Sequence, residues 1–129
     1  MANKVLLAVA STLEALTGLV LIIVQSTIRF LLGTDVSGAA RVIARVAGFG
    51  LLLLGISCWP RVEATLPRLR AMLIYNVLAT VYLGYLRFGT GSAGKLLLPA
   101  VAVHAVLAIL FIGVAFKHQP HRRLAERSQ

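Results

Sequence analysis

The chain has 129 residues, of which 59% are hydrophobic and 13% charged, and its mean hydropathy is +0.90. A soluble domain is about a quarter charged, so this composition excludes an ordinary soluble fold and indicates one membrane-embedded domain. Thirteen Lys and Arg against four acids give a formal charge of +9. Most of these cations flank apolar runs, and no basic face is combined with aromatic residues that could stack on bases. We therefore expect the lipid bilayer, and no nucleic acid, as their partner.

Four apolar segments follow one another along the chain, at about residues 5–28, 39–59, 69–86 and 96–116. At about 1.5 Å per residue, each is long enough to cross most or all of a hydrocarbon core roughly 30 Å thick. The connections between them are short, which favours antiparallel neighbours. The predicted fold is an all-α membrane protein whose four transmembrane helices form an up-down-up-down antiparallel bundle over residues 1–117.

The first segment begins like a secretory signal peptide, because one basic residue, Lys4, precedes an apolar run. The run continues to Val24, beyond the usual length for such a peptide, and it contains Glu14. We therefore interpret the segment as a retained first span.

Glycine and proline mark the connections between the spans. Residues 33–38 and 89–94 combine Gly with small or polar residues and predict turns. Pro60 and Pro67 bracket the second connection, where they should end one helix and help to start the next.

The distribution of basic residues predicts the orientation of the bundle. Four spans place both termini on one side, which carries eight basic residues, whereas the other side carries at most five. The positive-inside rule then places both termini in the cytoplasm, most simply of a bacterial inner (plasma) membrane, with residues 118–129 as a basic cytoplasmic tail. The eight are Lys4, Arg61, Arg68, Arg70, Lys117, Arg122, Arg123 and Arg127; the five are Arg29, Arg41, Arg45, Arg87 and Lys95.

Small residues recur every fourth position in the second span, at Ala40, Ala44 and Gly48. Such a ridge lets another helix backbone approach closely. The partner is either another helix of the same chain or a second copy in a homodimer, and the sequence does not choose between them.

Glu14 is the most informative residue of the first span. It lies ten residues after Lys4, about 15 Å into the membrane and near its midplane. An ionised side chain there costs about 2.5–3.5 kcal/mol, so a carboxyl group at this depth is usually functional. Its spacing from Ser11 and Gly18 predicts that it faces the bundle. The structural alternative is a neutral or ion-paired Glu that only ties two helices together.

His104 is the corresponding residue of the fourth span. It lies nine residues beyond Lys95, about 14 Å deep from the opposite side. At the same level, Glu14 and His104 could share a proton, which makes them the candidate catalytic pair. Alternatively, His104 is a hydrogen-bonded packing residue.

Four further residues complete a predicted pocket. In the third span, Asn76 is costly in lipid unless it faces another helix, and Tyr75 and Tyr82 are compatible with an inward stripe. In the second span, Arg45 either extends outward to the membrane surface or pairs with an acid such as Glu14. Asn76, Tyr75, Tyr82 and Arg45 are therefore the candidate ligand-binding residues.

The sequence indicates neither a metal site nor a cofactor. The single cysteine, Cys58, excludes an intrachain disulfide and belongs to no zinc or redox motif. His118 and His121 in the tail have no third ligand, so we interpret them as part of a solvated basic segment. A bis-His haem site would need a second His at the depth of His104, and the chain has none there.

The second span also carries a family resemblance, in the pattern formed by Arg45, Gly48, Leu51, Leu52 and Gly55. This pattern resembles the Arg-then-Gly helix of small four-helix DoxX-like membrane proteins, and the length, the four spans and the short connections are also similar. The resemblance implies an accessory role in thiol or quinone redox chemistry. It carries no catalytic residue onto this chain.

A second family, the small multidrug-resistance transporters, is similar in size and number of spans, and Glu14 resembles the acidic residue of their first span. The third span departs from their pattern, because it reads Tyr75, Asn76, Val77 and has no Trp. His104 is also foreign to that family. Such a transporter is therefore the alternative.

Three functions follow from these observations. The first is binding of a lipophilic small molecule (a quinone, an isoprenoid or a sterol-like compound) by an acid–base membrane enzyme of the isomerase or cyclase type, or by a redox-complex subunit. The second is proton-coupled transport in a homodimer, in which Glu14 binds proton and substrate in turn. The third is a structural or assembly subunit of a larger membrane complex, whose buried polar residues only set helix register.

Overall fold

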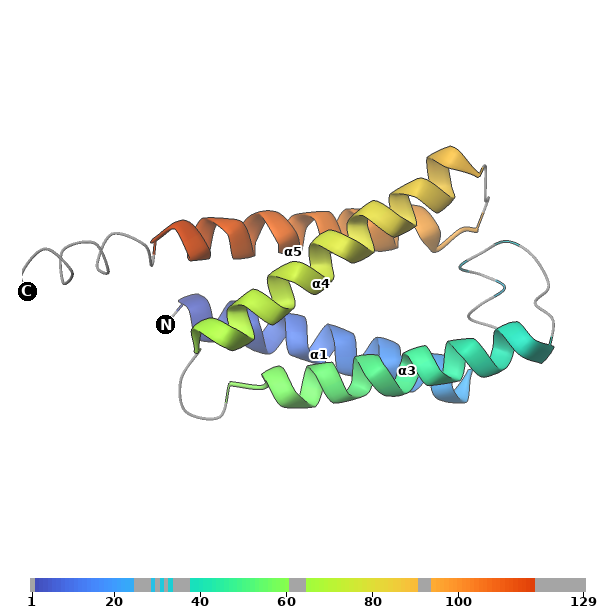
Figure 1. Cartoon of the computed structure of the whole chain (residues 1–129), viewed down its shortest axis with the longest axis horizontal. Helices are drawn as coiled ribbons and strands as arrows, with labels where there is room; N and C mark the ends of the chain where they lie inside the picture. The colour runs from blue at the N-terminus through green and yellow to red at the C-terminus, as the bar shows by residue number, and fades with distance from the viewer. Residues whose placement is uncertain are drawn as a thin grey trace, which may run out of the picture.

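The computed structural model of the chain describes residues 2–24, 29, 31, 33, 38–60, 65–90 and 94–117. These ranges contain four long helices and no strand: α1 (Ala2–Ile23), α3 (Gly38–Cys58), α4 (Leu66–Gly84) and α5 (Leu97–Lys117) (Figure 1). A π-helical turn, η1 (Tyr85–Gly89), extends α4. All four helices are long and apolar enough to cross a membrane. The predicted all-α class with four candidate spans is therefore confirmed.

The helix boundaries differ most from the prediction in the first span. We expected about residues 5–28, whereas α1 begins at Ala2 and ends at Ile23. Residues 25–28 of that predicted span lie outside the described residues, as does the tail 118–129.

Proline acts at the second connection as predicted. Helix α3 ends at Cys58, two residues before Pro60. Helix α4 begins at Leu66, three residues earlier than expected, because Pro67 fits the first turn of a helix, where its missing N–H leaves no hydrogen bond unmade.

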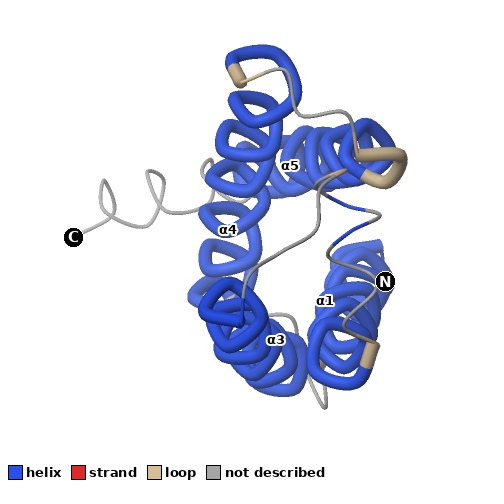
Figure 2. The backbone as a smooth tube through the Cα atoms, turned by 90° about the vertical axis from the view of Figure 1, so that its right-hand side faces the viewer, coloured by secondary structure: helices blue, strands red, loops and turns tan. Residues whose placement is uncertain are grey.

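The helices associate in two pairs. Helix α1 packs mainly against α3, and α4 packs mainly against α5, with fewer contacts between the pairs (Figure 2). A Cβ on Gly55 of α3 would lie 2.5 Å from the carbonyl oxygen of Ser11, and one on Gly48 would lie 2.7 Å from that of Gly18. Ser11 therefore lies opposite Gly55, whereas Gly18, later in α1, lies opposite Gly48, earlier in α3. The two helices are antiparallel.

The close approach of α1 and α3 shows which helix packs against Gly48, one residue of the predicted small-residue ridge. Gly48, at the end of the predicted small-residue ridge, faces α1 of the same chain. Glycine allows the two backbones to touch because it has no Cβ. Packing within the chain is therefore the role of Gly48, while a homodimer on the rest of the ridge stays a prediction.

The outer surface of the described helices is largely apolar, and three polar side chains are buried between them. Phe88 is 74% exposed, and Ile23 and Ile43 are each 68% exposed. A helix of a soluble bundle would carry polar residues on that face, whereas these faces suit contact with lipid. The buried polar side chains among the described residues are Ser11, Glu14 and Asn76.

The apolar core lies at one end of the molecule. It combines the N-terminal half of α1 and the start of α4 with the ends of α3 and α5. Beyond this core, α1 and α5 have few contacts with each other, and a cavity lies between them. The core residues are Leu7, Ala10, Cys58, Leu69, Met72, Leu107 and Phe111.

Candidate functional site

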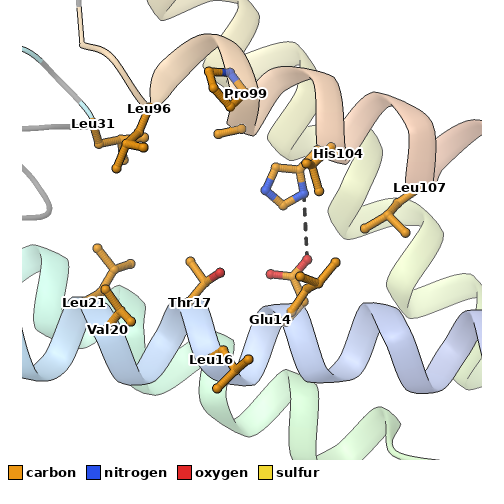
Figure 3. A pocket seen from close by; sticks show the side chains of 13 residues that line it. Glu14, Leu16, Thr17, Val20, Leu21, Leu31, Leu96, Pro99, His104 and Leu107 are labelled. Atoms are coloured by element: carbon orange, nitrogen blue, oxygen red, sulfur yellow. Dashed lines mark ion pairs between the residues drawn. The ribbon is translucent and has the colours of Figure 1, made fainter.

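A cavity of about 400 Å³ lies between α1 and α5 (Figure 3). This volume is in the range of roughly 300–1,000 Å³ that holds small molecules in proteins. Its lining is almost entirely apolar, and its polar side chains are Glu14, Thr17 and His104. The full lining consists of Leu13, Glu14, Leu16, Thr17, Val20, Leu21, Leu31, Leu96, Pro99, Ala100, Val103, His104 and Leu107.

Glu14 occupies the cavity wall formed by α1. The predicted inward stripe is confirmed over the described residues, since Ser11 is 0% exposed, Glu14 is 1% exposed and Gly18 is buried. The side chain of Tyr75 on α4 lies beside the Glu14 carboxyl group, close enough to interact with it. Oxygen Oε1 of that carboxyl has no hydrogen-bond partner among the described residues. A buried polar atom without a partner is costly, so this oxygen calls for an explanation.

His104 lies across the cavity from Glu14. Its Nδ1 is 3.7 Å from Oε1 of Glu14 and 2.9 Å from Oδ1 of Asn76. Figure 3 shows the imidazole of α5 and the carboxyl of α1 pointing toward each other. The sequence placed these two groups at the same depth, and the tertiary structure brings them together.

Asn76 links α4 to α5 at this point. It is 0% exposed, and its side-chain amide donates to the carbonyl oxygen of Met72 at 2.9 Å. Its Oδ1 faces His104, and its own backbone carbonyl accepts from Thr80 Oγ1 at 2.7 Å. The expectation that Asn76 faces another helix is confirmed, and the residue fixes the orientation of the imidazole.

Tyr75 also contacts the imidazole. Its ring meets the ring of His104 edge to face, with centroids 5.7 Å apart and planes at 80°. Tyr75 therefore touches both members of the Glu14–His104 pair and restricts the rotation of each side chain.

Two of the predicted ligand-binding residues lie elsewhere, which corrects that part of the pocket. Tyr82 is 63% exposed although it lies seven residues after Tyr75 and on nearly the same face of α4. Helix α4 crosses the bundle obliquely, so this later part of it runs along α5 and away from α1 (Figure 1). Arg45 is exposed on α3, and among the described residues the basic side chain within 4.0 Å of the Glu14 carboxyl group is that of His104, at 3.7 Å.

Two features of the site were missed by the sequence analysis. Thr17 lines the cavity three residues after Glu14, and that spacing could have indicated it. Ser11 Oγ is buried without a hydrogen-bond partner among the described residues, a feature that no sequence pattern shows.

Comparisons with models of known protein families, with curated proteins and with solved structures give no match. The resemblance to DoxX-like proteins therefore stays a prediction.

The arrangement brings a carboxyl group and an imidazole together at the polar end of an apolar cavity. Both groups gain and lose protons readily, and both lie where a bound molecule would contact them. Among the described residues, no group of three His, Cys, Asp or Glu side chains lies close enough to hold a metal ion. The chemistry that this geometry supports is hydrogen bonding to, and proton exchange with, a bound molecule.

Proposed function

We propose that this chain is an integral membrane protein that binds a lipophilic small molecule between α1 and α5. The molecule places a polar atom beside Glu14 and His104 and its apolar part along the remaining cavity lining. A quinone, an isoprenoid or a sterol-like compound has this combination of properties.

The observation that carries the proposal concerns Glu14 Oε1, which is buried, lies on the cavity wall and has no hydrogen-bond partner within the part of the chain that the structure describes. A buried acceptor or donor without a partner costs about 1–3 kcal/mol. A ligand that supplies the missing hydrogen bond removes that cost. The apolar lining then favours a lipophilic ligand over a water-soluble one.

The proposal includes the arrangement in the membrane. The four helices cross the bilayer in up-down-up-down order, with both termini and the connection between α3 and α4 on the cytoplasmic side of a bacterial inner membrane. The exposed apolar side chains, such as Phe88 and Ile43, support contact with lipid. The cavity then extends from mid-membrane depth toward the outer leaflet, the side of Leu31 and Leu96.

Glu14 and His104 would exchange protons with the bound molecule, while Tyr75 and Asn76 hold the two groups in place. An acid–base enzyme of the isomerase or cyclase type needs such a pair. A subunit of a redox complex, the role implied by the DoxX-like resemblance, would use the same pair to bind a quinone. Binding is common to both roles, and it is the part of the function that the geometry supports.

Native mass spectrometry of the protein extracted gently from its own membrane tests the proposal. We expect a co-purifying lipophilic molecule that is lost in Glu14→Gln, which keeps the size of the side chain and removes its charge and acidity. Thr12→Val is the matched control, because Thr12 is exposed on α1 and its hydroxyl bonds to Ala8 O, away from the cavity.

Two outcomes would contradict the proposal. A wild-type protein that carries no lipophilic molecule and takes up none from a lipid extract would show that the cavity is not a binding site. Retention of the molecule in Glu14→Gln, with a change in stability alone, would instead favour a structural subunit in which Glu14 only ties helices together.

A further inference from the structure

The hydrogen bonds of Asn76 assign the proton on His104. The carbonyl oxygen of Met72 can only accept, so the Asn76 side-chain atom 2.9 Å from it is the amide nitrogen, which donates. The other side-chain atom of Asn76, Oδ1, is therefore an acceptor and faces Nδ1 of His104 at 2.9 Å. An acceptor requires a donor, so Nδ1 carries the proton.

The proton on Nδ1 leaves the second ring nitrogen as an acceptor. A neutral imidazole has one N–H and one lone pair, and here the lone pair lies on Nε2. In Figure 3 the ring nitrogen without the dashed line points into the cavity. The cavity therefore contains a fixed hydrogen-bond acceptor on α5, opposite the carboxyl group of α1.

The distance to Glu14 is consistent with a neutral imidazole. A charge-assisted N–H···O bond is about 2.7–2.9 Å long. The separation between Nδ1 of His104 and Oε1 of Glu14 is 3.7 Å, and the Nδ1 proton is directed to Asn76 instead. The Nδ1 proton therefore serves the hydrogen bond to Asn76 and not an ion pair with Glu14.

We infer that the polar atom of the bound molecule is a hydroxyl group, so that the ligand is a lipophilic alcohol or phenol. This inference rests on the proposed function. The ligand hydroxyl donates its one proton to Nε2 of His104, and its oxygen accepts a hydrogen bond from Oε1 of Glu14 in the neutral, protonated form of that side chain. This Glu14 oxygen is the buried atom that has no hydrogen-bond partner among the described residues. A hydroxyl has one donor and two lone pairs, so it can make both bonds at once. A ketone, quinone or ether offers acceptors only and leaves Nε2 unpaired.

Matched probes that differ only in the polar group test this inference. Farnesol, farnesyl methyl ether and farnesal share one isoprenoid chain, and 4-nonylphenol with its methyl ether provides a second pair of different shape. Their affinities are measured in detergent by competition against a photoreactive lipophilic alcohol that crosslinks to the cavity. We expect each hydroxyl compound to bind roughly ten- to a hundredfold more tightly than its methyl ether, the range expected for one unpaired buried polar group.

A variant of His104 identifies the acceptor. In His104→Asn, the side-chain amide can still donate to Oδ1 of Asn76, but nothing replaces Nε2 in the cavity. We expect the preference for hydroxyl over ether to fall to about twofold or less, while apolar binding of both compounds persists. Thr12→Val is the control, because Thr12 is exposed on α1 and does not line the cavity, and it should keep the preference.

The possible results separate this inference from the function on which it rests. Equal binding of alcohol and ether by the wild-type protein overturns the hydroxyl assignment and leaves lipophilic binding intact. Tighter binding of farnesal than of farnesol also overturns it, because an aldehyde only accepts and cannot donate to Nε2 of His104. If Thr17→Val loses the preference for hydroxyl over ether and His104→Asn keeps it, the ligand hydroxyl bonds to Thr17. That result overturns the assignment to His104. No binding of any probe overturns the proposed function itself.

Discussion

Gly18 and Gly48 face each other across the α1–α3 interface with no space for a side-chain carbon on either residue. A Cβ on Gly18 would lie 2.5 Å from the carbonyl oxygen of Gly48, and a Cβ on Gly48 would lie 2.7 Å from that of Gly18. Both obstructing atoms belong to backbones, so the helices themselves would have to separate. This contact holds α1 in the position that presents Glu14 to α5.

The variant Gly48→Ala should destabilise the protein, because its methyl group meets the α1 backbone. We expect a loss of about 1–3 kcal/mol, typical of an overpacked interface. Gly50→Ala is the matched control on α3, since a Cβ there meets nothing within 4 Å. Reversible unfolding in mixed micelles measures both variants. Equal stability of the two variants would show that α1 and α3 are not held together by this contact.

Tyr75→Phe should weaken the site, because it removes a hydroxyl that can donate a hydrogen bond to the neighbouring Glu14 carboxyl group. Hydrogen bonds between membrane helices contribute about 0.6 kcal/mol on average and up to about 1.7 kcal/mol. We expect a loss of that size in unfolding free energy, together with weaker retention of the lipophilic molecule. Tyr82→Phe is the control on the same helix, because Tyr82 is largely exposed. A larger loss of unfolding free energy and ligand retention in Tyr82→Phe than in Tyr75→Phe would contradict this prediction. It would mean that Tyr82 belongs to the pocket, as the sequence predicted.

Ala100→Phe should fill the cavity and exclude the ligand without disturbing Glu14 or His104. Ala100 lines the cavity, whereas Ala102 on the same helix is exposed. We expect at least a tenfold loss of affinity for the lipophilic probe in Ala100→Phe and no loss in Ala102→Phe, because only the first ring occupies ligand volume. Competitive photocrosslinking measures the difference. Equal crosslinking of the two variants would place the ligand outside this cavity.

Cysteine labelling tests the proposed orientation. In a Cys58→Ser background, single cysteines replace Thr65 before α4 or Thr90 after η1, both exposed positions without charge. Because α4 joins them, they should lie on opposite sides of the membrane. We expect a membrane-impermeant maleimide to label the cysteine at 90 in intact spheroplasts and the one at 65 only after permeabilisation. The reverse pattern would invert the bundle, and equal labelling would mean that α4 does not cross.

The amino-acid sequence by itself determined the four helices, the positions of Pro60 and Pro67 at the second connection, and the buried face of α1 that carries Glu14. These features depend on local quantities: the length of an apolar run, the geometry of proline, and spacing along one helix. The same reasoning predicted that His104 lies level with Glu14, as their 3.7 Å contact shows, and that Asn76 needs a partner. Each of these could be predicted because it involves one helix at a time.

Only the tertiary structure decided which of the predicted groups meet. Spacing gives the face of a helix but not its rotation or crossing angle relative to a neighbour. Tyr75 and Tyr82 share a face of α4, yet the oblique path of that helix brings Tyr75 to Glu14 and leaves Tyr82 exposed. The proton on His104 likewise depends on the side-chain orientation of Asn76, which a carbonyl one turn earlier on α4 sets. Contacts between helices, rather than patterns within them, determine the chemistry of the cavity.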